Sequence, residues 1–308
     1  MINQLQSQPT TQFRIHPATL PGHVSLTVAN LDRQLEFYEK AIGLKVHWRK
    51  DNAAGLGVGG DDLLRLTEVP GARRHRNTTG MYHFAILLPN KRELALAIAR
   101  LFALRYPNSP TDHVMTKTTY LDDLEGNNIE LYTESPEDGY MGFENGGFVA
   151  RHADGTPSDG REPLDLEALF KHLTPEDRLD TPMPPGTRIG HYHLYISNLA
   201  DSLRFYHEQL GFDNMGVAPA FRMGMVSAGR YHHHIGLNTW MGEGIPPAPP
   251  NSLGMRYLTF VMPSKESYDD LMAQIGQQNI ATEQTEEGLA VCDPSQNKIV
   301  FTYKSNEN

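Results

Sequence analysis

An internal repeat is the feature of this sequence that most constrains its fold. The segment from Asn30 to Gly43 recurs from Asn198 to Gly211, and the paired Asn, Phe, Tyr and Gly residues all keep the same offset of 168. A constant offset indicates a duplicated structural unit. In each copy an alternating run, 23–28 or 191–196, precedes the Asn and an amphipathic stretch that ends at the Gly. This order predicts a strand followed by an N-capped helix.

A second, weaker repeat pairs residues 80–91 with 254–265. Each copy is followed by a helical stretch and then by a Gly/Asn turn and a strand. The chain is therefore predicted to be an α+β protein made of four units of strand, helix and further strands. The predicted segments are an N-terminal tail at 1–20, units one and two at 21–135, a Pro-rich linker with a short helix at 136–187, and units three and four at 188–305.

Composition excludes several classes of function. The formal charge is -10, and no stripe of Lys and Arg is present to neutralise a phosphate backbone, so nucleic acid is not an expected partner. No run of about 18 apolar residues predicts a membrane span, and residues 1–20 lack the apolar core of a signal peptide. The single cysteine, Cys292, cannot form an internal disulfide. We therefore expect a cytoplasmic protein.

Three side chains in the first half form a candidate metal site. His23 and His83 lie in the opening strands of units one and two, and Glu130 lies in the strand that closes unit two. Alternation along each strand directs all three to the polar face. Two imidazoles and one carboxylate leave open positions on an ion, as in non-haem Fe(II) oxygenases. The structural alternative is that the histidines are satisfied within the sheet and that Glu130 is an exposed strand residue.

The four βαβββ units and one motif carry a resemblance to a known family. The motif is His113-VMTKTT-Tyr120-LDDLE-Gly126-NNI-Glu130. It is similar to the signature of extradiol ring-cleavage dioxygenases, from which it departs at Thr119 and Leu124, and the chain resembles the vicinal oxygen chelate superfamily, closest to the bacterial catechol 2,3-dioxygenase-like branch. The resemblance implies that the four modules pair into two half-open barrels with a metal inside.

The resemblance also implies a function. The expected reaction is Fe(II)-dependent cleavage of catechol or a substituted catechol with O₂, which gives a 2-hydroxymuconic semialdehyde-type product. His113 and Tyr120 match family positions beside the substrate, where they would orient the catechol and manage its protons. The structural alternative is that His113 caps a loop and that Tyr120 packs in the wall of the barrel. Mn(II) is the alternative metal, because its preferred ligands overlap with those of Fe(II). A homodimer is the commonest symmetry of a soluble protein.

Two alternatives come from other classes of function. A glyoxalase I-like lyase or isomerase would take a further ligand from the strand that closes unit one, but the position there that matches Glu130 is Arg65, which cannot bind a metal. If Arg65 points inward it can pair with an anionic substrate group; otherwise it is an exposed strand residue. The third hypothesis is a non-enzymatic protein that binds an aromatic compound or drug.

The second half of the chain lacks part of the predicted ligand set. The positions that correspond to His83 and Glu130 are Tyr257 and Val300. We therefore expect this half to lack the metal triad and to support the fold, cover the first barrel or mediate dimer contacts. It does contain His191, His193 and the run 232–234. Whether these histidines form a second metal site stays open at this point, because three consecutive residues cannot all face one side of a strand.

Overall fold

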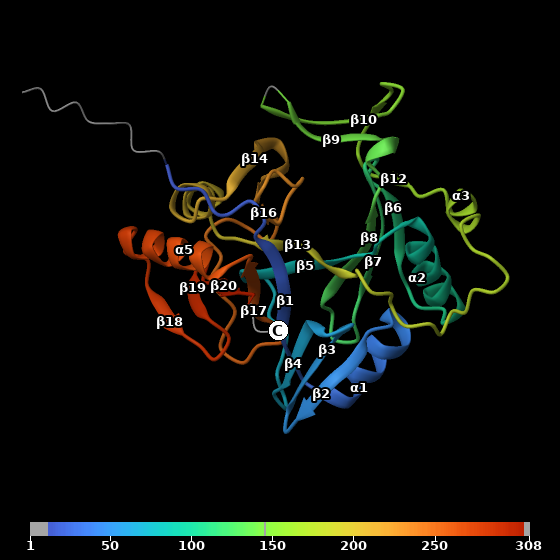
Figure 1. The fold of residues 1–308 in the computed structure, drawn as a ribbon, viewed down its shortest axis with the longest axis horizontal. Helices are drawn as coiled ribbons and strands as arrows, with labels where there is room; N and C mark the ends of the chain where they lie inside the picture. The colour runs from blue at the N-terminus through green and yellow to red at the C-terminus, as the bar shows by residue number, and fades with distance from the viewer. Residues whose placement is uncertain (1–11, 145, 305–308) are drawn as a thin grey trace, which may run out of the picture.

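The computed structural model describes residues 12–144 and 146–304, so residues 1–11 of the predicted tail lie outside the described residues (Figure 1). Each predicted unit is a βαβββ module. Unit one consists of β1 (Leu20–Val28), α1 (Leu31–Phe37), β2 (Lys45–Lys50), β3 (Ala53–Val58) and β4 (Asp61–Glu68). Unit two consists of β5 (Gly80–Leu87), α2 (Lys91–Ala103), β6 (Ser109–Asp112), β7 (Thr116–Asp122) and β8 (Asn128–Glu134).

Units three and four repeat this order. Unit three consists of β13 (Arg188–Tyr195), α4 (Leu199–Leu203), β14 (Asp213–Ala218), β15 (Met223–Ser227) and β16 (Ile235–Asn238). Unit four consists of β17 (Gly254–Met262), α5 (Lys265–Gln277), β18 (Thr282–Gln284), β19 (Leu289–Cys292) and β20 (Lys298–Tyr303). The α+β class and the four modules are thus as the sequence predicted, and no helix in the described ranges is both long and apolar enough to cross a membrane.

The helix boundaries follow the predicted signals. The Asn30 side chain accepts a hydrogen bond from the backbone N–H of Arg33, and Asn198 does the same for Asp201, at 2.9 Å in each copy. These caps satisfy an N–H group that has no partner inside the helix. Both helices continue into a π-helical segment, Tyr38–Ile42 or Arg204–Gln209. The first ends at Gly43, whose φ of 93° suits a residue without a Cβ.

The sheets pair the modules differently from the predicted domains 21–135 and 188–305. In one sheet the strand order is β18-β19-β20-β17-β1-β4-β3-β2, which joins unit one to unit four. In the other, β12-β6-β7-β8-β5-β13-β16-β15-β14 joins unit two to unit three. The opening strands are antiparallel across each join, and within each unit the first and last strands are parallel. Each half-open barrel therefore combines one module from the first half of the chain with one from the second half.

Two glycines near the joins leave room for side chains of the partner unit. A Cβ on Gly22 would lie 2.3 Å from Thr259 Oγ1, and a Cβ on Gly190 would lie 1.8 Å from Tyr132 Oη. Gly22 and Gly190 are repeat-equivalent positions, separated by the same offset of 168. The Thr259 hydroxyl accepts from the backbone N–H of His23 at 2.7 Å, which ties unit one to unit four. Glycine is needed where two chain segments approach this closely.

The linker is more structured than a Pro-rich segment suggests. It contains the predicted helix, α3 (Leu166–Phe170), and also β9 (Gly139–Glu144), β10 (Gly147–His152), β11 (Pro157–Ser158) and β12 (Glu162–Pro163). The β9–β10 hairpin stands at the top of the view in Figure 1. Strand β12 pairs with β6 at the edge of the sheet that joins units two and three. The linker therefore reaches the barrel in which the candidate site lies.

Candidate metal centre

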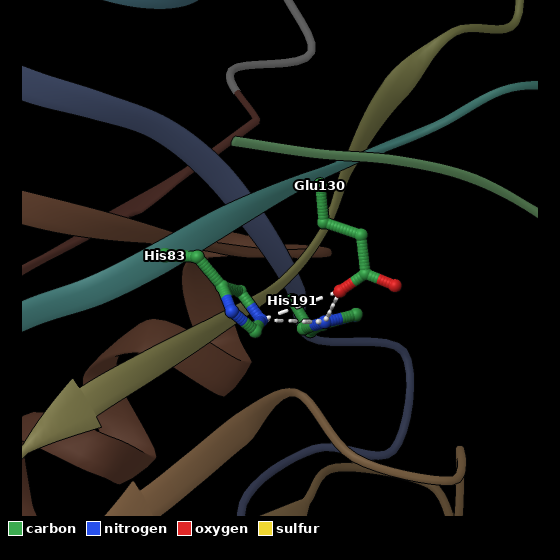
Figure 2. A group of neighbouring side chains, drawn as sticks. All are labelled: His83, Glu130 and His191. Carbon is green, nitrogen blue, oxygen red and sulfur yellow. Dashed lines mark hydrogen bonds and ion pairs between the residues drawn. The ribbon is translucent and has the colours of Figure 1, made fainter. Parts of the chain in front are cut away.

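Three buried side chains converge in the barrel of units two and three. His83 comes from β5, Glu130 from β8 and His191 from β13 (Figure 2). The His191 Nε2 atom lies 3.1 Å from Glu130 Oε2 and 3.3 Å from His83 Nε2, and the last pair, His83 Nε2 to Glu130 Oε2, is also 3.3 Å. One donor atom of each residue thus faces a common point.

Strand register explains this convergence. Strand β5 lies between β8 and β13, so the central strand carries one candidate ligand and each neighbour carries another. Phe84 and Ile86 alternate with His83 and are fully buried in the core on the other side of the sheet. Glu130 pairs in register with Ala85, two residues after His83, and His191 pairs with the same Ala85 across β13. The small Ala85 side chain lies between the two outer ligands.

The electrostatic state of the site suits a cation. Burial lowers the pKa of His83 to about 3, so its imidazole is neutral near pH 7 and a ring nitrogen is free to bind a metal. Burial alone would raise the pKa of Glu130, but His191 and His83 reverse that effect and hold it below its usual range. Glu130 is therefore an ionised carboxylate with 3% exposure. A buried anion is costly unless a positive charge beside it balances it, and a bound cation would supply that charge.

The donor set itself fits a divalent metal. Two ligand atoms that lie about 2.1 Å from one ion at right angles are about 3.0 Å apart, close to the three observed separations of 3.1 to 3.3 Å. Three mutually adjacent ligands occupy one face of an octahedron and leave the opposite face open. His83, Glu130 and His191 could therefore hold a metal ion and still admit small ligands.

His23 lies elsewhere, which corrects the predicted ligand set of His23, His83 and Glu130. Its Nε2 atom is 2.9 Å from Glu287 Oε2 in the barrel of units one and four, and its ring packs edge-on against Tyr257. His191 is the repeat equivalent of His23, and it takes the place that the sequence assigned to His23 because unit two pairs with unit three. The offset of 168 was the signal that could have identified it.

His113 and Tyr120 lie beside the three candidate ligands. The His113 Nε2 and Tyr120 Oη atoms are 2.9 Å apart, and the Tyr120 ring centroid is 5.7 Å from that of His83. The other ring nitrogen of His113 contacts the carbonyl oxygen of Gly160 at 2.5 Å, so the linker fixes the ring. Burial, together with the charge of Glu130, raises the pKa of Tyr120 well above its usual value. The phenol therefore keeps its proton.

His193, His232 and His233 lie around this centre without joining it. The His193 ring lies 5.1 Å from that of His83, and the His233 ring lies 4.2 Å from that of His191, measured between centroids. His232 Nε2 contacts Glu134 at 3.2 Å. Among the described residues, His83, Glu130 and His191 form the only group of three donors close enough to share an ion. The run 232–234 thus forms a wall beside the centre rather than a second three-ligand site.

A fourth protein ligand is not available at the equivalent position of unit three. In unit two, Glu130 on the closing strand pairs with Ala85, two residues after His83. In unit three, the residue two places after His191 is His193, and it pairs with Gly236 on the closing strand. Gly236 has no side chain, and a Cβ there would lie 2.9 Å from the His193 ring. The same register in unit one pairs Ser25 with Arg65. Neither odd-numbered unit therefore adds a carboxylate or amide ligand at this position.

Comparisons with known proteins agree with this fold. The Glyoxalase/Bleomycin resistance protein/Dioxygenase superfamily profile matches residues 20–131, and the chain belongs to this superfamily. A relative from Bacillus subtilis (strain 168) named catechol-2,3-dioxygenase is 38% identical over 283 residues, which cover 91% of this chain and 95% of the relative.

Solved structures with lower sequence identity share the fold. A protein of Bacillus subtilis superposes with a TM-score of 0.59 at 14% identity, over 95% of this chain and 85% of the other. Glyoxalase I from Zea mays superposes with a TM-score of 0.54 at 15% identity, over 92% of both chains. These likenesses show the fold alone.

Proposed function

We propose that this protein is an Fe(II)-dependent extradiol dioxygenase of the catechol 2,3-dioxygenase type. The substrate would be catechol or a substituted catechol, and the ring would open beside the diol with uptake of both atoms of O₂ to give a 2-hydroxymuconic semialdehyde-type product. The main support is the set of His83, Glu130 and His191, whose three donor atoms lie close enough together to bind one face of a metal ion. The 38% identical relative named catechol-2,3-dioxygenase supports the same reaction.

Bound Fe(II) would supply the sites for the two vicinal oxygens and for O₂, together with the redox chemistry that joins them. The protein would supply position and proton control. The neutral His83 and the ionised Glu130 are ready to bind an ion without losing a proton or gaining one. Their burial in the barrel also keeps bulk water away from the reacting ring.

His113 and Tyr120 would manage the substrate proton. Their contact of 2.9 Å links the imidazole of His113 to a phenol that keeps its proton. In this proposal the Tyr120 hydroxyl donates to a catechol oxygen and His113 takes the proton that the second hydroxyl releases. The carbonyl oxygen of Gly160 holds the far side of the His113 ring, which keeps the reactive nitrogen directed at the site.

The test is turnover with defined metals. Protein loaded anaerobically with Fe(II) should convert catechol into a yellow ring-cleavage product with one O₂ consumed per product. Glu130→Gln should lose iron and turnover, whereas Glu137→Gln, an exposed carboxylate on the linker, should keep both. Activity that needs Ni(II), Co(II) or Zn(II) and consumes no O₂ would instead favour a lyase. Absence of product with catechol, methylcatechols and chlorocatechols would overturn the proposal.

A further inference from the structure

The barrel of units one and four contains a cavity of about 550 Å³ that the proposed reaction does not use. It is lined from β1, β2, β3, β4, β17, β18 and β20 and by the turn between β18 and β19. Its charged lining residues are Arg65, Arg256, Lys298, Glu283, Glu286 and Glu287. This is the barrel in which Tyr257 and Val300 stand at the positions of His83 and Glu130. The same fold that brings together metal ligands in one barrel therefore leaves an open, polar space in the other.

The floor of the cavity is a row of polar side chains across three strands. Ser25 on β1 pairs in register with Arg65 on β4 and with Tyr257 on β17, and all three line the cavity. Ser25 is 1% exposed, and its hydroxyl has no hydrogen-bond partner among the described residues. A buried hydroxyl without a partner costs free energy that a ligand atom can recover.

A guanidinium group, that of Arg65, occupies the place that Gly236 has in the other barrel. Arg65 Nη1 lies 2.8 Å from Glu287 Oε1, and Glu287 also accepts a hydrogen bond from Tyr257 and lies 2.9 Å from His23. Arg65 Nε donates to Asp62 at 2.8 Å. These partners fix the guanidinium at the edge of the cavity. The charge of Arg65 is balanced by Asp62 and Glu287, and its remaining N–H groups are left as donors for a ligand oxygen.

A second cation lies at the rim. The register shift between Ser25 and Leu26 along the β1–β17 pair lets two successive residues, Arg256 and Tyr257, line the same cavity. Arg256 is exposed, donates to the Thr67 hydroxyl and forms no ion pair within the described part of the chain. Trp48, which is 38% exposed, supplies an aromatic wall beside Arg65. A free cation, an aromatic wall and an unpartnered hydroxyl therefore surround one space.

We propose that this cavity binds a small aromatic carboxylic acid that carries a second oxygen on its ring. The carboxylate pairs with Arg256, the ring packs on Trp48 and the second oxygen reaches Ser25 beside Arg65. A planar guanidinium is well suited to a carboxylate because it can donate two parallel hydrogen bonds. This site is separate from the candidate metal centre, and it does not depend on the proposed dioxygenase reaction.

The test uses 4-hydroxybenzoate as the probe and 4-methylphenol, which lacks the carboxylate, as its neutral counterpart. Calorimetry on the full chain should give saturable binding of the acid and at least about tenfold weaker binding of the neutral compound. Arg256→Met should weaken binding of the acid by about tenfold or more. Arg178→Met, a change at an exposed linker residue, is the matched control and should bind as the unchanged protein does.

Two further measurements locate the probe. Glu130→Ala disables the other barrel and should leave binding unchanged. In a Trp240→Phe background Trp48 is the only tryptophan, so the acid should change its fluorescence with the same dissociation constant. No saturable binding, or equal binding by Arg256→Met, overturns the proposal. Loss of binding in Glu130→Ala together with retention in Arg256→Met also overturns it, because the probe then occupies the metal-centre barrel.

Discussion

A few side chains at equivalent positions separate the two barrels. His23 and His191 are the same residue type on repeat-equivalent strands, yet His191 faces Glu130 and His83 while His23 faces Glu287 and Tyr257. The closing strand decides this difference, since Val300 stands where the other barrel has Glu130. An aliphatic side chain at that position cannot bind an ion, so one imidazole is a candidate ligand and the other belongs to a hydrogen-bonded network.

Tyr120→Phe tests the role of the phenol. The change removes the hydroxyl that contacts His113 at 2.9 Å and leaves the three candidate ligands themselves in place. We expect turnover of catechol to fall by roughly 10²-fold, as for loss of a hydrogen-bond donor to a reacting oxygen, with bound iron unchanged. Steady-state kinetics and elemental analysis measure the two quantities. Tyr268→Phe in unit four is the control and should change neither. Loss of iron from Tyr120→Phe would indicate a structural role instead.

His234→Asn tests the cost of keeping buried histidines neutral. Burial lowers the pKa of His234 from 6.5 to about 3, while its Nδ1 atom accepts from the backbone N–H of Ala228. Between these two pH values the unfolded chain binds a proton that the folded chain excludes, so the unfolding free energy decreases as the pH falls. Each such histidine contributes a slope of up to about 1.36 kcal/mol per pH unit.

Asn keeps an acceptor for Ala228 but does not titrate. The unfolding free energy of His234→Asn, measured by urea denaturation from pH 7 down to pH 4, should therefore fall less steeply than that of the unchanged protein. Parallel pH profiles for the two proteins would show that His234 is protonated in the folded state or does not titrate in this range.

At the scale of elements, the repeated Tyr of the odd-numbered helices connects modules that do not share a sheet. Tyr38 donates to Asp123 at 2.8 Å, and Tyr206 donates to Asp293 at 3.0 Å. Asp123 is the acidic residue of the His113–Glu130 motif, and it also accepts from the backbone N–H groups of Glu125 and Asn127. The motif is therefore partly a turn that holds β8, and with it Glu130, in register.

Tyr38→Phe should destabilise the fold by about 1–3 kcal/mol, because it leaves a buried carboxylate with one donor fewer. Tyr206→Phe should cost a similar amount at the repeated position. Tyr140→Phe, at an exposed tyrosine of the linker hairpin, is the control and should have little effect. Urea denaturation measures all three. Equal midpoints for Tyr38→Phe and Tyr140→Phe would contradict the coupling between helix and turn.

The sequence predicts the modules better than their pairing. Caps such as Asn30 and the alternation around His83 are local signals, and they correctly predicted helix starts and strand faces. Pairing of the opening strands is not local. All four strands alternate in the same way, so His23 or His191 could complete the set equally well on pattern alone. The choice depends on tertiary contacts such as that of Gly190 with Tyr132, which no single segment reveals.

At the scale of the whole molecule, each barrel contains one module from the first half of the chain and one from the second half. The linker connects the two halves. Strand β12 pairs with β6, and the linker residue Gly160 contacts His113. A metal centre built in this way needs residues from both halves. A fragment that ends before unit three would keep His83 and Glu130 but lose His191, so we expect the intact chain to be required for tight metal binding.

The most direct test of the central claim compares metal content in His191→Ala and His23→Ala. Both variants replace a buried or half-buried histidine on an equivalent strand, so each serves as the control for the other. After anaerobic loading with Fe(II) and desalting, His191→Ala should retain little iron and no turnover of catechol, whereas His23→Ala should keep about one iron per chain and most of its activity. Retention of iron by His191→Ala together with its loss from His23→Ala would contradict the assignment of the centre to His83, Glu130 and His191.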